Sequence, residues 1–255
     1  MANPIKDKIA RGKPAIGVSI MFPSAQLVEM AGRLGYDWVL IDCEHGSISV
    51  EQAERMITAA EAAGIVPVVR PPSDDPDIIG QLMDCGAKGI QAPHIRTAKE
   101  AEKIVDAVKY FPEGHRSIAV GTRAAHYGFN LSMAEYAEKS NEEMLVCIQI
   151  EDKEALAELP EIYKVKGIDV LFIGPSDLSQ SLGHPGDYEH PVVKEAISDA
   201  FRFIESIGIA AGTAGNIDYL PKRLGQGVLY YYVHITTLLK YSTQEVFRKL
   251  QEAEE

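Results

Sequence analysis

Two carboxylates and an imidazole follow an apolar run near the N-terminal end of the sequence. The run 38–41 leads into Asp42, Cys43, Glu44 and His45, and Gly46 comes next. An apolar run of this length is typical of a strand buried on both faces, and polar side chains at its C-terminal end can enter a shared cleft. We interpret His45 as a candidate general base whose ring Asp42 could orient. The alternative is that Asp42 and Glu44 cap the helix that follows.

An arginine ends the next apolar run. Residues 65–69 are apolar, and Arg70 is followed by two prolines. A guanidinium is permanently charged and offers several donors, so Arg70 could neutralise an oxyanion on a substrate. The alternative is a structural ion pair with Asp42 or Asp84.

Two further carboxylates follow apolar runs in the second half of the chain. Glu151 comes directly after the run 144–150, which contains Gln149, and Asp177 follows the run 168–173. Carboxylate and amide oxygens are ligands suited to Mg²⁺ or Mn²⁺, so a divalent ion is predicted here. The alternatives are that Ser176 or Asp177 caps a short helical turn and that Glu151 pairs with Lys153.

The elements that position these residues alternate regularly. Strands are expected at 15–20, 37–42, 65–70, 88–92, 144–150, 168–173, 208–212 and 228–233. Helices are expected at 25–34, 50–63, 75–85, 97–109, 191–207, 217–225 and 236–253, with a short helical stretch after residue 151. The irregular connection 110–140 is expected to be a functional loop or lid. This alternation, with no linker between halves, favours a single (β/α)8 barrel domain over residues 1–255, in which the strand ends share one mouth.

Composition excludes several classes of protein. The formal charge of −12 disfavours nucleic acid as a partner. No apolar run approaches ~18 residues and the N-terminus has no apolar signal core, so neither membrane spanning nor export is predicted. The three cysteines lack metal-ligand spacing and are expected to be reduced. We therefore expect a cytoplasmic enzyme.

Several segments together resemble the HpcH/HpaI aldolase family of metal-dependent class II pyruvate aldolases, which includes 4-hydroxy-2-oxoheptanedioate and 2-keto-3-deoxy sugar acid aldolases. The resemblance extends over nearly the whole chain. The segments that carry it are Ile41–Gly46, Val69–Arg70, Gly86–Ile90 with Pro93 and Thr97–Ala98, Tyr110–Arg116, Gln149–Glu151 and Gly174–Ser179.

The resemblance implies roles for the residues near the strand ends. His45 matches the catalytic base, Asp42 and Asp84 match acids that tune it, and Arg70 matches the residue that stabilises developing charge. Glu151 and Asp177 match ligands of a divalent ion, Mg²⁺, Mn²⁺ or Co²⁺.

Other matching residues bind substrate in the family. Gln149 matches one of them, and the segment Gly174, Pro175, Ser176 and Asp177 matches the one that holds the pyruvate carboxylate through backbone amides. The family also implies a homohexamer, a trimer of dimers that exchange the C-terminal helix. Ser117 stands where the family often has glycine, and no acidic residue follows the last strand. The resemblance therefore does not predict which aldehyde is the second substrate.

These expectations point to a reversible aldol reaction that cleaves a 4-hydroxy-2-oxo acid to pyruvate and an aldehyde. Lys88 and Lys166 precede strands and only Lys153 lies near the expected mouth, so a Schiff-base aldolase is disfavoured. The nearest alternative is a citrate-synthase-like or malyl-CoA-type lyase that uses oxaloacetate or a CoA thioester. A sugar-phosphate isomerase and a catalytically silent binding protein are more distant alternatives.

Overall fold

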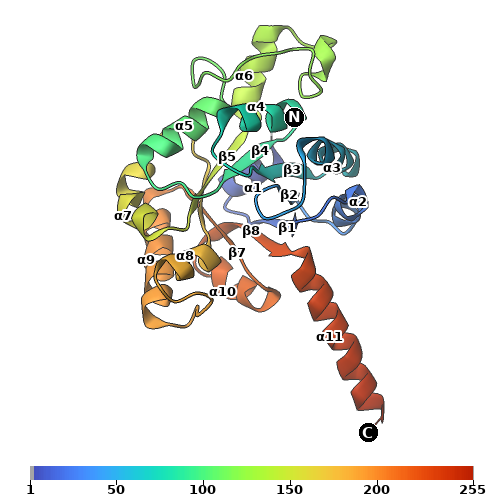
Figure 1. The fold of residues 1–255 in the computed structure, drawn as a ribbon, viewed down its shortest axis with the longest axis vertical. Coiled ribbons are helices and arrows are strands. Elements are labelled where there is room, and N and C mark those ends of the chain that lie inside the picture. Colours follow the sequence, from blue (N-terminus) through green and yellow to red (C-terminus); the bar gives the residue numbers. More distant parts are fainter. Residues whose placement is uncertain (1–2, 255) are drawn as a thin grey trace.

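Eight parallel strands close into a barrel in the computed structural model, which describes residues 3–254 (Figure 1). The strands pair in chain order from the first to the eighth, and the eighth pairs with the first, so that Gly17 lies opposite Tyr232. Helices surround the barrel and alternate with the strands. The predicted (β/α)8 architecture is confirmed.

The strands are β1 (Ala15–Ile20), β2 (Trp38–Asp42), β3 (Val66–Arg70), β4 (Gly89–Ala92), β5 (Leu145–Ile150), β6 (Val170–Ile173), β7 (Ala210–Ala214) and β8 (Val228–His234). The α-helices are α1 (Pro4–Ala10), α2 (Ala25–Arg33), α3 (Val50–Ala63), α4 (Pro76–Asp84), α5 (Ala98–Val108), α6 (Met133–Glu143), α7 (Lys153–Ile162), α8 (Pro175–Ser181), α9 (Pro191–Ile207), α10 (Leu220–Leu224) and α11 (Ile235–Glu254). Short 3-10 turns are η1 (His126–Gly128) and η2 (Ile217–Tyr219).

Two of the differences from the expected elements have local reasons. β7 begins at Ala210 rather than at residue 208, because Gly208 adopts φ 75° and ends α9 in the left-handed conformation. The helix α6 lies within and beyond the connection expected to be irregular. Ser132 and Glu135 form a capping box at its start, which was a readable signal for a helix.

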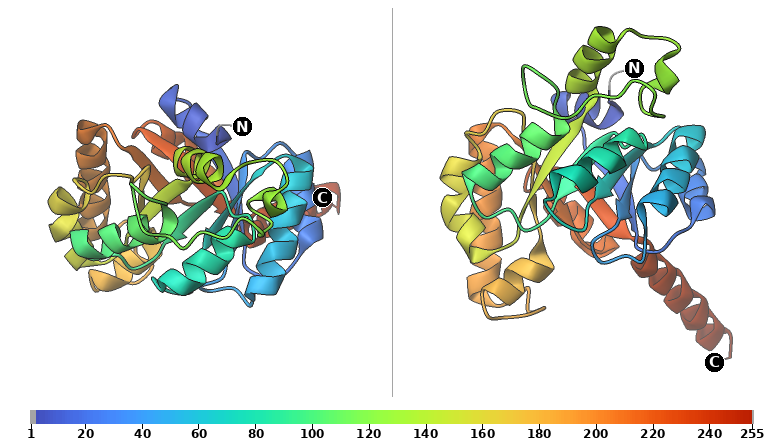
Figure 2. Two further views of the ribbon diagram at one scale, coloured as in Figure 1. Left: turned by 90° about the horizontal axis from the view of Figure 1, so that it is seen from above. Right: turned by 45° about the horizontal axis from the view of Figure 1, so that its top comes forward.

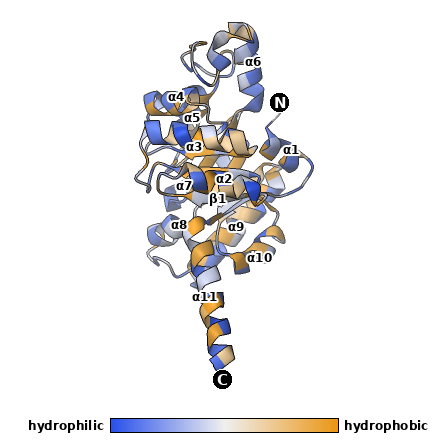
Figure 3. Cartoon of the chain, turned by 90° about the vertical axis from the view of Figure 1, so that its right-hand side faces the viewer, coloured by the Kyte–Doolittle hydropathy of each residue, from blue (hydrophilic) through white to orange (hydrophobic). Residues whose placement is uncertain are grey.

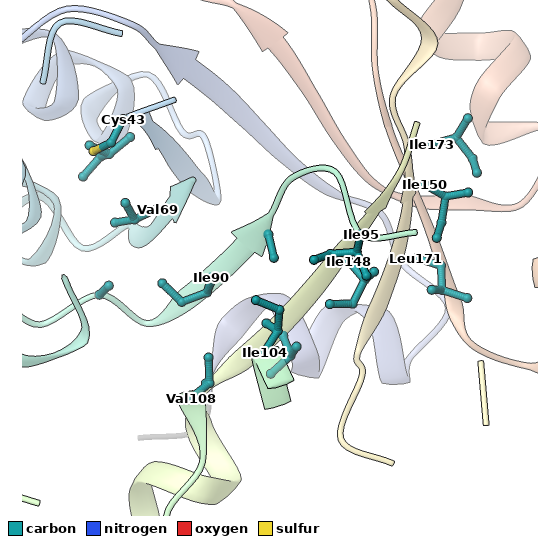
Figure 4. Close-up of a cluster of buried hydrophobic side chains, with 14 of the residues drawn as sticks. Cys43, Val69, Ile90, Ile95, Ile104, Val108, Ile148, Ile150, Leu171 and Ile173 are labelled. Atoms are coloured by element: carbon teal, nitrogen blue, oxygen red, sulfur yellow. The ribbon is translucent and has the colours of Figure 1, made fainter. Parts of the chain in front are cut away.

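Apolar side chains form a layer between the strands and the surrounding helices. Figure 4 shows part of it, where Ile148 of β5 lies near Ile104 of α5, and Ile150 of β5 lies beside Ile173 and Leu171 of β6. Because strand side chains alternate, Gln149 between the two isoleucines faces the other side, which is the barrel interior. The packing of β5 thus follows the two-residue period of a strand.

A second apolar cluster fills the barrel interior. The Trp38 ring stacks on Tyr230 with centroids 4.0 Å apart, and Phe172 stacks on Tyr232 at 5.4 Å. A Cβ on Gly17 would lie 2.3 Å from the Trp38 ring, so only glycine leaves room for it there. Ile5 of α1 belongs to the same cluster and closes it at one end. The barrel interior is therefore a packed core and not an open channel.

The last helix does not pack along the barrel. Figures 1 and 2 show α11 projecting away from the body of the protein, and α6 with its preceding loop forms a separate protrusion. The hydropathy colouring in Figure 3 shows apolar residues along α11, and Leu239, Val246, Phe247 and Leu250 are more than half exposed. None of the described helices combines the length and apolar character needed to cross a bilayer.

Candidate active site

One pocket at the C-terminal ends of the strands collects most of the residues selected from the sequence. It has a volume of about 310 Å³ and is lined by His45, Arg70, Gln149, Glu151 and the segment 174–177, together with Tyr232 and His234. We call it the active-site pocket. The barrel thus brings together side chains from β2, β3, β5 and β6 that are far apart in the chain.

Arg70 is held at the wall of this pocket by two carboxylates. Its Nε donates to Asp42 Oδ1 at 2.9 Å, a second bond joins Nη2 to Asp42 Oδ2, and Nη1 lies 3.1 Å from Glu44 Oε2. Asp42 is fully buried and Arg70 is 5% exposed. Burial alone would lower the pKa of Arg70, but the hydrogen bond and charge of Asp42, with Glu44, raise it above its ordinary value. The alternative that Arg70 pairs with Asp42 is therefore confirmed.

Asp42 acts on the backbone of the β2 turn rather than on the imidazole. Its Oδ1 accepts the N–H of Glu44 at 3.1 Å and that of His45 at 3.3 Å. The His45 side chain is 49% exposed, and its Nε2 lies 3.8 Å from Glu44 Oε2. Asp42 therefore positions His45 through the main chain, whereas the sequence analysis expected a contact with its ring.

The turn after β2 does not cap the next helix through its carboxylates. Ser49 is the N-cap of α3, and it forms a capping box with Gln52. A Cβ on Gly46 would lie 2.1 Å from the carbonyl oxygen of Asp42, so the tight path of this turn requires glycine. Asp42 and Glu44 are left to interact with Arg70.

A chain of buried hydrogen bonds leads from the barrel interior to Glu151. Tyr230 Oη donates to Gln91 Oε1 at 3.1 Å, Gln91 Nε2 donates to Gln149 Oε1 at 2.5 Å, and Gln149 Nε2 donates to Glu151 Oε2 at 2.6 Å. Glu151 is 1% exposed and does not pair with Lys153, whose Nζ lies 3.9 Å from Glu154 Oε1. The network fixes the orientation of the Glu151 carboxylate.

The charge around Glu151 suits a divalent cation. Burial raises the pKa of Glu151, the His94 N–H and ring lower it, and the charges of Asp177 and Glu44 raise it again. Two carboxylates that repel each other in a confined site are a donor set that a hard cation stabilises. A Cβ on Gly174 would lie 2.5 Å from Glu151 Oε2, so the end of β6 fits closely around this oxygen.

The metal donors supplied by the protein are few. Within residues 3–254, no three His, Cys, Asp or Glu side chains are grouped as a ready-made metal centre. Mg²⁺ commonly uses one or two carboxylates and keeps positions for water and substrate. Glu151 and Asp177 therefore fit an ion whose remaining ligands come from outside the chain.

The segment after β6 begins a short helix directly at the pocket. Gly174 is the N-cap of α8 and Pro175 is its first residue, and neither Ser176 nor Asp177 caps it through a side chain. The first N–H groups of a helix have no intrahelical acceptor. Ser176 Oγ instead lies 3.1 Å from Tyr188 Oη. The predicted capping alternative for Ser176 and Asp177 is not what the structure has.

Asp84 lies outside this group in the single chain. It ends α4, and its Oδ1 accepts from Arg116 Nη2 at 2.5 Å. It lines a different pocket, together with Asp106 and His115. Because barrel helices run opposite to the strands, the C-terminal end of α4 leads to the start of β4, not to the mouth. The structure thus does not bring Asp84 to His45. Within the described residues, no contact supports the expected role of Asp84 in tuning this base.

His94 is a polar residue of the site that was not among the residues selected from the sequence. Its N–H donates to Glu151 Oε1 at 2.8 Å, and its Nε2 lies 3.2 Å from Glu44 Oε1. Burial would lower its pKa, but the charges of Glu151, Glu44 and Asp152 raise it. It lies two residues after β4, and His45 and Arg70 were selected because they too stand at or just after the end of an apolar run. The same criterion would have selected His94. Its φ of 54° is unusual for a residue other than glycine.

Comparison with known proteins assigns this barrel to a group of enzymes. A family model described as HpcH/HpaI aldolase/citrate lyase matches residues 18–220. A hydroxypyruvate/pyruvate aldolase of Sagittula stellata is 38% identical over 218 residues, which cover 86% of this chain and 85% of that protein. A 2-keto-3-deoxy-L-rhamnonate aldolase of Klebsiella pneumoniae is 36% identical over 252 residues, which cover 98% and 92%.

A solved structure of an enzyme named as a citrate synthase is also similar. The crystal structure of the citrate synthase SbnG superposes with a TM-score of 0.86 at 28% sequence identity, covering 98% of each chain. The same barrel therefore occurs in aldolases and in an enzyme that makes citrate.

Proposed function

Because the chain belongs to the HpcH/HpaI aldolase/citrate lyase family, we propose that it is a class II pyruvate aldolase that reversibly cleaves a 4-hydroxy-2-oxo acid to pyruvate and an aldehyde. The observation that carries the proposal is the convergence of His45, Arg70, Gln149, Glu151 and Asp177 in one pocket. A base, a fixed cation and two carboxylates are the groups that formation of an enolate needs.

Glu151 and Asp177 are the residues that would hold a divalent ion, with Mg²⁺, Mn²⁺ and Co²⁺ as candidates. When bound, such an ion supplies Lewis-acid polarisation of the 2-oxo acid. Gln149 keeps Glu151 oriented by donating to Oε2, which leaves the carboxylate little freedom to turn away. The first residues of α8 line the same pocket, and their free N–H groups are proposed to bind the substrate carboxylate.

Arg70 stabilises the charge that develops on the enolate oxygen. A guanidinium has five N–H donors, and two of them donate to Asp42, so three remain: both on Nη1, which lies 3.1 Å from Glu44 Oε2, and one on Nη2. These are available to a substrate oxygen. Because both carboxylates are buried against it, the guanidinium is held before substrate arrives and needs little reorganisation.

His45 moves the proton of the reacting hydroxyl. In the cleavage direction it takes the proton from the C4 hydroxyl as the C3–C4 bond breaks, and the bonding electrons pass to the pyruvate fragment as its enolate. Its half-exposed ring can reach a substrate in the pocket, while Asp42 holds its main chain. In the synthetic direction His45 returns the proton to the new alkoxide.

Incubation of the full chain with pyruvate and a panel of aldehydes tests the proposal. Carbon bond formation should be lost with a chelator, be restored by Mg²⁺, Mn²⁺ or Co²⁺, and resist borohydride. Asp177→Ala should abolish metal retention, whereas His45→Ala should keep the metal and lose turnover. Full activity in either variant, or inactivation by borohydride in the presence of pyruvate, contradicts the assigned roles.

A second candidate is supported by the similarity to SbnG. A citrate-synthase-like or malyl-CoA-type enzyme would form an enolate in the same pocket from oxaloacetate or a thioester. Turnover with these substrates, and none with pyruvate and aldehydes, would favour it.

The assembly and the setting of the enzyme also belong to the proposal. The apolar side chains along α11 support exchange of this helix between the subunits of a dimer, and a hexamer of three such dimers follows from the family resemblance. The three free cysteines, two of them buried, support a reducing cytoplasmic setting.

A further inference from the structure

A second pocket opens beside the active-site pocket. Its volume is about 230 Å³, and it lies between the segment after β6, the first part of α9 and the segment from the end of β7 to α10. Both pockets are lined by Pro175, Ser176, Ala214 and His234, so they adjoin each other. Figure 1 shows α8, α9 and α10 on the same side of the barrel. The two pockets thus share part of their lining.

This second pocket is basic, although the protein is acidic. Lys194, Lys222 and Arg223 line it with one carboxylate, Glu189, while the whole chain has a formal charge of −12. Lys194 Nζ lies 2.8 Å from Glu189 Oε2. The hydrogen bond and charge of Lys194 lower the pKa of Glu189, and Lys222 and Arg223 lower it further. Two cations thus remain without an ion-pair partner in the part of the chain that the structure describes. We call this the basic pocket.

Arg223 is the cation of the basic pocket that neighbouring side chains hold in place. Its guanidinium lies 5.3 Å from the centre of the Phe201 ring and 5.9 Å from that of Tyr219, and its Nη1 donates to Gln226 Oε1 at 2.9 Å. Burial lowers its pKa more than the charges of Tyr231, Tyr219 and Glu189 raise it. Within the described residues no carboxylate forms an ion pair with it. Desolvated charges are ordinarily paired, and an anionic ligand would supply the missing partner.

We propose that the basic pocket binds the anionic far end of the acceptor aldehyde, with Arg223 and Lys222 as specificity-determining residues. The inference rests on the proposed aldolase activity and adds a substrate class to it, namely aldehydes that carry a carboxylate or a phosphate. The aldehyde chain between a carbonyl carbon in the active-site pocket and an anionic group beside Arg223 would pass Ser176 and His234, which line both pockets.

Matched pairs of aldehydes test this inference on the full chain loaded with metal. Succinic semialdehyde is compared with butanal, and glyceraldehyde 3-phosphate with glyceraldehyde, each with pyruvate as donor. The two pairs distinguish a carboxylate from a phosphate. For at least one pair the anionic member should have the higher kcat/KM, and Arg223→Met should reduce that preference by about tenfold to a hundredfold, since a hydrogen bond to a charged group is lost.

Three further variants control for folding and for charge. Arg202→Met removes an exposed arginine of α9 that lines neither pocket, and it should leave the preference unchanged. Arg223→Lys keeps the charge and should retain part of the preference. Lys222→Met removes an exposed cation without touching the aromatic packing, so it reports even if Arg223→Met unfolds. A preference that neither Arg223→Met nor Lys222→Met reduces, or equal kcat/KM within both pairs, overturns the inference.

Exchange of the pyruvate methyl protons in D₂O separates this inference from the proposed function. Exchange needs the enolate but no aldehyde. If the wild type exchanges protons and shows no anion preference, only the basic pocket assignment fails. If it does not exchange them, the aldolase proposal fails, and the inference that rests on it is overturned with it.

Discussion

The close fit of Gly174 around Glu151 leads to a sharp prediction. In Gly174→Ala the added Cβ would lie 2.5 Å from Glu151 Oε2 and 2.9 Å from Glu151 Cβ. Backbone strain would not contribute, because Gly174 has φ −88° and ψ 95°, which alanine adopts freely. The substitution therefore acts only by pushing the carboxylate or the start of α8.

The required movement sets the size of the effect. Ordinary contact begins at 3.4 Å, so the Glu151 oxygen or the β6 end must shift by about 0.9 Å. Glu151 cannot turn freely, because Gln149 and the His94 N–H hold its two oxygens at 2.6 and 2.8 Å. A displacement of about 1 Å in a catalytic group costs about 100-fold in rate, or roughly 2.7 kcal/mol of transition-state stabilisation.

Steady-state kinetics at saturating metal, with a metal titration, measure this loss. We expect kcat to fall about 100-fold and the metal concentration for half activity to rise. Gly80→Ala is the matched control, since Gly80 lies in α4 with nothing within 4 Å of an added Cβ. It should keep activity and stabilise the fold by about 0.5–1 kcal/mol. A folded Gly174→Ala enzyme with activity within twofold of wild type would refute the reasoning.

Other predictions concern stability, thiol reactivity and assembly. Asp42→Asn breaks the buried ion pair with Arg70 and should lower the free energy of unfolding by about 3 kcal/mol. Calorimetry should then show a fall in Tm of roughly 6–12 °C. Glu51→Gln in an exposed pair should change Tm much less, and equal shifts would contradict the argument. Burial, with the charges of Glu54 and Asp84, raises the pKa of Cys85 to about 11. At pH 8 the thiolate fraction of Cys85 is then about 0.001 in the native protein, whereas it is about a quarter in the unfolded chain. A thiol reagent should therefore label Cys85 about 200-fold more slowly in the native protein. Similar labelling rates in the two states would disprove this. Replacing Val246 and Leu250 by Asp should lower the native mass by light scattering if α11 packs in a partner subunit; Lys249→Glu is the control, and an unchanged mass in both counts against helix exchange.

Local sequence signals accounted for the alternation of elements and for much of the site. The capping box at Thr97 and Glu100 and the left-handed Gly64 are readable because each depends on residues within one turn. The same holds for β5, where a two-residue period sends Gln149 and Glu151 to the inner side. Helix α6 was missed although Ser132 and Glu135 carried an equally local signal.

Pairing between distant residues could not be predicted in this way. From the sequence we expected Asp42 to contact the His45 ring, and either Asp42 or Asp84 could have been the partner of Arg70. The barrel pairs β2 with β3 so that Asp42 lies opposite Arg70, and it sends Asp84 to Arg116. It also turns His94 onto Glu151.

The sequence by itself determined the kind of barrel, the identity of the polar residues at its strand ends and the side of each strand on which they lie. Those properties depend on periodicity and on short-range caps, which a linear chain carries in full. Only the tertiary structure decided which carboxylate neutralises Arg70, which histidine touches Glu151, and that a basic pocket adjoins the active-site pocket. Such contacts arise when the register of the closed sheet and the packing of the outer helices bring together segments that are far apart in the sequence. No local sequence pattern specifies which of these segments will meet.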